Sequence, residues 1–160
     1  MGRWDTMFTD DLRLRLATIE ATCGEDLTYY DSWLHGISHL REVALIAGWI
    51  AGEMGEDVEA AMVAGFLHDC GRVDDGGGNR HAHDSERLAR PILQKHFPHL
   101  DTDRICDAIR RHADGEVTDD PIAGALWDAD RLTLERLDRR IEEDRLSTSE
   151  GKRLARKLPG

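Results

Sequence analysis

The chain has 160 residues, of which 33% are charged and 40% are apolar, a balance typical of one compact helical domain and not of a disordered segment. It carries 32 Asp and Glu against 21 Lys and Arg, a formal net charge of −11. Because such a surface repels an extended phosphate backbone, we expect no nucleic acid partner.

The first half of the chain predicts three helices. The first begins after Thr9 with acidic residues in its first turn. Ser38 is the expected cap of the second, whose apolar residues recur at helical spacing as far as Gly55. Asp57 opens the third, which ends before Gly71. The short turn between the second and third helices predicts antiparallel neighbours.

The second half predicts three more helices and a polar tail. Residues 73–80 include three successive glycines and form the expected flexible flap. The later helices are expected over about residues 83–96, 101–112 and 121–137, with a further short helix after Ser149. No strand pattern is present. We therefore predict an all-α bundle of about six helices. One domain is expected over 1–160, with its core at about 34–138 and the first helix and tail packed on it.

Three cysteines, Cys23, Cys70 and Cys106, are odd in number and lack CxxC spacing, which argues against a disulfide framework and a thiolate zinc site. No run of residues is long and apolar enough for a membrane span, and the first residues are too polar for a secretion signal. We expect a cytoplasmic protein without a membrane partner. The sequence does not indicate the oligomeric state.

Four of the eight histidines lie on or beside apolar helix faces, where an imidazole needs a partner. These are His39, His68, His81 and His112. Asp69 and Asp130 also lie on or beside apolar helix faces. Carboxylates are almost never buried without a cation or a partner. At about 100° per residue, Asp130 follows the apolar face of its helix, and Asp128 points roughly 200° away. We therefore expect Asp128 to be solvated or to support a ligand.

Three short strings carry a family resemblance. They are His39-Leu-Arg-Glu-Val43, Phe66-Leu-His68-Asp69-Cys-Gly-Arg72 and Trp127-Asp-Ala-Asp130-Arg-Leu132. Their H…HD…D order resembles the HD superfamily of metal-dependent phosphohydrolases over about residues 34–134, most of the chain. The longer strings HGISH and LHDCGRVDDG are similar to a small bacterial HD subgroup.

The resemblance implies which side chains hold metal. The first cation is expected on His39, His68, Asp69 and Asp130, with Asp69 bridging to a second cation. Members with two metals add histidines from later helices, and His81 and His112 match these best. Helical phase favours His81 over His83 at this position, but the sequence leaves the choice open.

The remaining candidates surround the metal. Asp69 and Arg72 are the expected catalytic residues. Arg72 stands where many members have a lysine, and its guanidinium suits a phosphate. Arg72, His35 and His83 are the expected substrate contacts.

Imidazole and carboxylate ligands without cysteine suit Mn, Fe, Co, Ni or Zn, at one or two ions per chain. Such an ion lowers the pKa of bound water to about 7 and so supplies hydroxide as a nucleophile. The predicted function is hydrolysis of a small phosphate ester or anhydride, with a nucleotide as one candidate. The alternatives are a di-iron oxygenase that cleaves a phosphonate and a non-catalytic binding module that contains a metal.

Overall fold

The computed structural model describes residues 4–133 and 140–157, and all regular secondary structure in this part of the chain is helical. The all-α prediction is confirmed. The helices are η1 (Asp5–Met7), α1 (Asp10–Gly24), α2 (Ile37–Glu53), α3 (Val58–Leu67), α4 (Arg80–His96), α5 (Thr102–Arg111), α6 (Pro121–Leu132), η3 (Glu143–Arg145) and α7 (Ser149–Arg156). No helix in the described residues is long and apolar enough to cross a membrane.

Capping side chains fix several of the predicted starts. Thr9, Asp57 and Asp101 each accept a hydrogen bond from the backbone N–H three residues later, at 3.0 to 3.2 Å. Each of these bonds satisfies one of the amide groups that an α-helix leaves free at its beginning. The starts of α1, α3 and α5 are therefore set locally, which is why the sequence predicts them.

Two predicted starts are wrong by a few residues. α2 begins at Ile37 after Gly36, so Ser38 lies inside the helix and is not its cap. α4 begins at Arg80, three residues before the expected start, because the backbone carbonyl of Asn79 already accepts the N–H groups of residues 82 and 83. Hydrophobic periodicity misses this turn, since Ala82 is the one apolar residue among residues 80–83. The predicted end of α6 near Leu137 lies outside the described residues.

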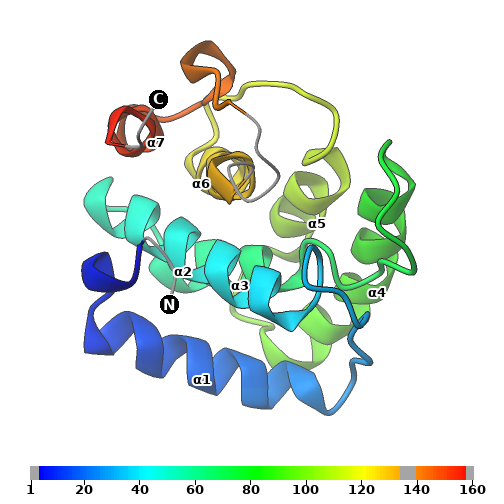
Figure 1. The fold of residues 1–160 in the computed structure, drawn as a ribbon. Helices are drawn as coiled ribbons and strands as arrows, with labels where there is room; N and C mark the ends of the chain where they lie inside the picture. The colour runs from blue at the N-terminus through cyan, green and yellow to red at the C-terminus, as the bar shows by residue number, and fades with distance from the viewer. Residues whose placement is uncertain (1–3, 134–139, 158–160) are drawn as a thin grey trace.

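α2 and α3 run through the middle of the molecule, with α1 on one side and α6 on the other (Figure 1). α4 and α5 pack together at one end, and α7 packs against α6 and α2. The core between these layers contains large side chains that are fully buried, among them Ile46, Phe66 and Trp127. The three cysteines are also buried and unpaired.

Two glycines allow close backbone contacts around the turn that follows α3. A Cβ on Gly65 would lie 2.8 Å from the Cα of Ala44, so only glycine lets α2 and α3 approach this closely. A Cβ on Gly71 would lie 2.6 Å from the backbone of Asp84 and Ser85. The Gly71 N–H also donates to the Ser85 hydroxyl at 2.9 Å. The turn at residues 68–72 is thereby fixed against both α2 and α4.

The expectation for Asp128 is wrong, because this side chain is fully buried. Its two carboxylate oxygens accept hydrogen bonds from the backbone N–H of Ser147 at 2.7 Å and from the backbone N–H and hydroxyl of Thr148 at 2.8 and 2.7 Å. Burial raises the pKa of Asp128 despite these bonds. Residues 146–148 cover the face of α6 that points away from the predicted site, so Asp128 holds the C-terminal segment onto the bundle.

Candidate metal centre

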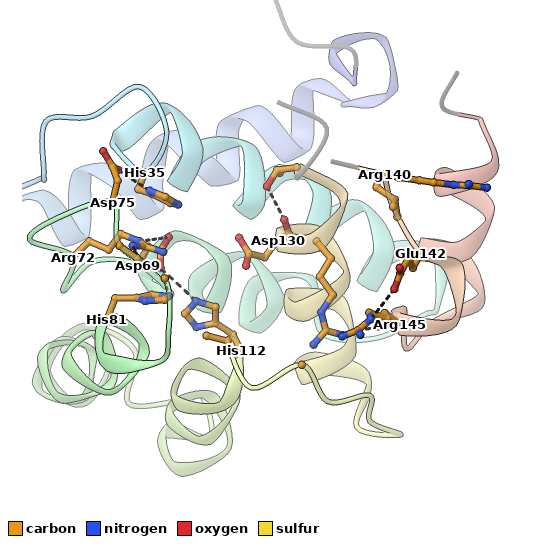
Figure 2. Close-up of a pocket in the computed structure, with 17 residues that line it drawn as sticks. His35, Asp69, Arg72, Asp75, His81, His112, Asp130, Arg140, Glu142 and Arg145 are labelled. Carbon is orange, nitrogen blue, oxygen red and sulfur yellow. Dashed lines mark hydrogen bonds and ion pairs between the residues drawn. The ribbon is translucent and has the colours of Figure 1, made fainter. Parts of the chain in front are cut away.

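The predicted ligands come from five helices that meet at one end of the bundle. His39 lies in the first turn of α2, His68 and Asp69 follow the last residue of α3, and Asp130 lies in α6. His81 lies in the first turn of α4 and His112 directly follows α5. Figure 2 shows Asp69, His81, His112 and Asp130 pointing toward one region between the helices.

Four ligand atoms of the first predicted set lie close together. The Nε2 atoms of His39 and His68 are 3.2 Å apart and lie 3.2 and 3.3 Å from Oδ1 of Asp130. Oδ2 of Asp69 lies 3.4 Å from both imidazole nitrogens. Neighbouring ligands on one ion, with bonds of about 2.1 Å, are about 3.0 Å apart in octahedral geometry and about 3.4 Å apart in tetrahedral geometry. These separations therefore fit a single divalent cation.

The second oxygen of Asp69 faces two further histidines. Oδ1 lies 3.3 Å from Nε2 of His112 and 3.7 Å from Nε2 of His81. This oxygen is buried and has no hydrogen-bond partner among the described residues. An unpartnered buried carboxylate oxygen is costly unless a cation or a donor reaches it. The arrangement fits Asp69 as a bridge between one cation on His39, His68 and Asp130 and another on His81 and His112.

Two of the imidazoles are oriented by the helices that carry them. Nδ1 of His68 donates to the carbonyl of Gly65 at 2.6 Å, and Nδ1 of His112 donates to the carbonyl of Ile109 at 2.7 Å. Because a carbonyl only accepts, the hydrogen lies on Nδ1, and in the neutral imidazole Nε2 is then the nitrogen with the lone pair. Both residues also stand at helix C-termini, where the partial negative charge of the backbone favours a cation.

The pKa values of Asp69, Asp130 and His81 are shifted in the direction that suits metal binding, and that of His39 is shifted in the opposite direction. Burial opposes the ionisation of Asp69 and Asp130, but the surrounding histidines hold both pKa values well below the usual range. Burial lowers the pKa of His81 to about 4, with Arg72 acting in the same direction. Burial also disfavours a proton on His39, but the two carboxylates outweigh it and raise its pKa. The carboxylates are therefore ionised and His81 is neutral near neutral pH, as ligands must be.

His35 and the glycine-containing loop form one wall beside these ligands. Nδ1 of His35 lies 2.7 Å from Oδ1 of Asp75, which also accepts from the hydroxyl of Ser32 at 2.8 Å. The His35 ring contacts that of His39, with centroids 5.6 Å apart. Asp75 thus ties the loop to the segment before α2. Asp75 could not be predicted from the sequence, because no local signal links it to a residue 40 positions earlier.

Arg72 lines the site, but much of its guanidinium is already engaged. Nε donates to Oδ2 of Asp69 at 3.3 Å, and Nη1 donates to the carbonyls of Asp74 and Gly76 at 3.2 and 2.8 Å. Among the described residues only Nη2 has no acceptor, so Arg72 orients Asp69 and the loop and offers one edge to a phosphate.

His83 is not brought to the site. It is exposed on α4 and does not line the cavity, whereas His81 does. Two positions along a helix rotate a side chain by about 200°, so only one of this pair is able to face the predicted metal ligands. The expectation that His83 contacts substrate is therefore wrong.

A cavity of about 460 Å³ is lined by four of the six predicted ligands, namely Asp69, His81, His112 and Asp130, and extends to residues 140–145. Its far end is lined by residues that were not among the predicted site residues: Arg131, Arg140, Glu142 and Arg145. Arg131 directly follows Asp130, a predicted ligand, and this position is the one signal that the sequence offers. The others come from the tail, whose position over α6 depends on tertiary contacts.

Several curated relatives of this chain are named Ribonuclease Y. Ribonuclease Y of Oceanobacillus iheyensis is 33% identical over 112 residues, 68% of this chain and 20% of that protein. Ribonuclease Y of Aquifex aeolicus is 34% identical over 99 residues, 61% of this chain and 16% of that protein. Ribonuclease Y of Listeria welshimeri is 51% identical over 39 residues, 24% of this chain and 8% of that protein. The chain thus spans a fifth or less of the length of these relatives.

The exclusion of nucleic acid on the basis of net charge is wrong, because these relatives are by name enzymes that act on RNA. A charge of −11 describes the whole surface, whereas the cavity has several arginines in its wall.

No solved structure matches the chain. The family model described as HD domain matches residues 36–147, about two thirds of the sequence, and this range includes every predicted metal ligand. The chain therefore belongs to the HD-domain family.

Proposed function

We propose that the protein hydrolyses a phosphate ester bond in a substrate that places one nucleotide-sized unit in the cavity. Membership of the HD-domain family places the chain in a superfamily of metal-dependent phosphohydrolases. The observation that carries the proposal is the position of Asp69, whose two carboxylate oxygens each face two imidazole nitrogens at 3.3 to 3.7 Å.

The proposed ligands are His39, His68, Asp69 and Asp130 for one divalent cation, with His81 and His112 for a second that shares Asp69. A divalent cation held in this way polarises a phosphoryl oxygen and makes water a better nucleophile near neutral pH. The buried and unpartnered Oδ1 of Asp69 supports this assignment.

The other residues of the chain position the substrate. Nδ1 of His35 is engaged by Asp75, which leaves Nε2 as the free ring nitrogen of a residue that lines the cavity. Arg72 adds a fixed positive charge beside Asp69, and its side chain is only 7% exposed. A fixed charge of this kind stabilises negative charge on phosphate more strongly than a mobile exposed charge does.

The substrate class rests on the cavity and on the relatives. A volume of about 460 Å³ lies within the range usual for small-ligand sites and suits one nucleotide unit rather than a duplex. The names of the relatives point to RNA. A free nucleotide and the end of a single-stranded RNA present the same chemistry to this cavity, so both belong in the test.

The test is hydrolysis by protein loaded separately with Mn, Co, Ni, Fe or Zn. The substrates are mononucleotides and short single-stranded RNAs, with phosphate release and RNA shortening as the readouts. We expect turnover with at least one metal, loss of turnover and of metal content in Asp69→Asn, and normal turnover in Asp10→Asn, an exposed control on α1. Full metal occupancy without turnover of either substrate would contradict the proposal.

The pairing of His81 and His112 with one oxygen of Asp69 also favours a second candidate, a di-iron oxygenase that cleaves a phosphonate. Protein loaded with iron under anaerobic conditions would then consume oxygen when a phosphonate is added. Hydrolysis supported by a metal without redox chemistry, such as Zn, with no oxygen uptake, would exclude this candidate.

A further inference from the structure

The cavity has a second end, on the other side of Asp130 from the histidines. In Figure 2, His81, His112 and Asp69 lie on one side of Asp130, and Glu142 and Arg145 lie on the other. The residues at this second end are Arg131, Glu142 and Arg145. They line the same cavity as the candidate ligands, so one small molecule is able to contact both regions.

Arg131 is held in place but lacks a full set of partners. Its Nη1 donates to the backbone carbonyl of Arg145 at 2.6 Å, and its guanidinium carbon lies 5.8 Å from the centre of the Trp127 ring. Nη2 is buried and has no hydrogen-bond partner, and among the described residues no carboxylate forms an ion pair with Arg131.

Arg111 provides a comparison within the same protein. Its guanidinium carbon also lies over the Trp127 ring, at 5.2 Å, but Arg111 does not line the cavity. Its nitrogens pair with Asp107 at 2.9 Å and with Glu116 at 2.6 Å. Contact with the tryptophan therefore does not explain why Arg131 has no carboxylate partner.

Arg145 adds a second guanidinium to this end of the cavity. Its Nε donates to Glu142 at 2.8 Å, and its two terminal nitrogens have no hydrogen-bond acceptor among the described residues. Arg140 also lines the cavity, but in Figure 2 its side chain extends away from the other labelled residues. Among the described residues, Glu142 is the only carboxylate that hydrogen-bonds to either guanidinium group, although Asp128, Asp130 and Glu116 act on Arg131 electrostatically. A buried donor without an acceptor is costly, and an anion that enters the cavity removes the cost.

We propose that Arg131 and Arg145 bind a second, non-reacting phosphate group of the substrate. The inference rests on the proposed function, which places the reacting phosphate at the metal ligands. It narrows the substrate to a nucleotide with phosphates at two positions or to an RNA in which a phosphate neighbours the reacting one. The two sources share this chemistry, and a nucleotide with a single phosphate lacks it.

The first test measures binding to the metal-loaded protein by isothermal titration. The probes are adenosine 5′-monophosphate and adenosine 3′,5′-bisphosphate. We expect the wild-type protein to bind the bisphosphate at least about tenfold more tightly, as for a charge-assisted hydrogen bond. Arg131→Gln should remove most of this preference, Arg131→Lys should keep part of it, and Arg111→Gln should keep all of it. If a probe is consumed, the ratio of the kcat/KM values of the two probes replaces the ratio of their affinities.

Arg145→Gln keeps the inference testable if Arg131→Gln does not fold. The Arg145 side chain is 63% exposed, and its backbone carbonyl, which holds Arg131, remains in the variant. This variant should also weaken the bisphosphate selectively. Equal binding of the two probes by the wild-type protein, or equal effects of Arg131→Gln and Arg111→Gln, would overturn the inference.

The second test separates this inference from the proposed function by comparing turnover of a 5′-phosphorylated dinucleotide with that of its unphosphorylated form. Turnover of both forms at the same kcat/KM would contradict the inference but remain consistent with the proposed function. A bisphosphate preference that depends on Arg131, with no turnover of any substrate, would support the anion site and contradict the proposed function. We expect faster turnover of the phosphorylated form and an effect of Arg131→Gln on that form alone.

Discussion

Substitution of Gly65 by alanine should damage both the stability of the fold and the candidate metal centre. The new Cβ would lie 2.8 Å from the Cα of Ala44 and 3.0 Å from its nitrogen, and both atoms belong to the backbone of α2. A backbone is unable to rotate away as a side chain does. The helices must therefore separate until the shortest contact reaches 3.4 Å, a shift of about 0.6 Å.

The size of the loss of stability can be measured against a matched control in α2. Gly52 is also helical, but a Cβ there would meet only Cγ2 of Val58 at 3.6 Å, an ordinary contact. Both substitutions gain about 0.5–1 kcal/mol from the higher helix propensity of alanine. The difference between the two variants in free energy of unfolding therefore isolates the steric cost, about 1–3 kcal/mol for an overpacked core.

The metal centre should respond as well, because α2 carries His39 and α3 ends at His68. The Nε2 atoms of these residues lie 3.2 Å apart, and metal sites tolerate displacements of only about 0.2 Å. Urea denaturation measures the stability of each variant, and metal analysis after dialysis measures retention. We expect Gly65→Ala to lose metal and Gly52→Ala to keep it. Equal stability and equal metal content of the two variants would refute the argument.

Three further variants test other parts of the structure. His81→Ala should lower the metal content per chain, as measured by atomic absorption, whereas His83→Ala should leave it unchanged; equal losses would contradict the choice between them. Asp128→Asn places an amide NH₂ against backbone donors and should cost about 1–3 kcal/mol in chemical denaturation, without loss of metal. The hydrogen bond from Arg41 lowers the pKa of Glu20 below its ordinary 4.5, so its stabilising effect is present above that pH and disappears as the pH falls through the lowered value. Glu20→Gln should therefore reduce stability near neutral pH by less than about 1 kcal/mol and match the wild type in acid; a deficit that persists in acid would refute this origin.

Local chemistry explains which parts of the fold and site the sequence predicts. Helix periodicity and the capping residues Thr9, Asp57 and Asp101 act within a few positions, so they identify most of the helices. The phase of α6 also separates Asp130 from Asp128 correctly. It fails to predict that Asp128 is buried, because the residues that cover it come from almost 20 positions later.

The same reasoning explains what the sequence misses at the site. Asp75 acts on His35 across 40 positions, and the carbonyl of Arg145 holds Arg131 across 14. Neither pair has a spacing that any helix or turn would indicate. Net charge fails for a related reason, since it sums over the whole surface and carries no information about which arginines line one cavity.

Gly65 shows how closely the centre depends on the helical core. The absence of a side chain on Gly65 lets α2 approach α3, which brings His39 toward His68. The carbonyl of the same residue accepts the Nδ1 hydrogen of His68 and so turns its Nε2 toward His39 and Asp130. Helix packing and imidazole orientation are therefore set by one residue in the buried part of α3. A change that loosens the contact between α2 and α3 should alter metal affinity before it alters the loops around the cavity. This order is expected because the site is built from packed helices.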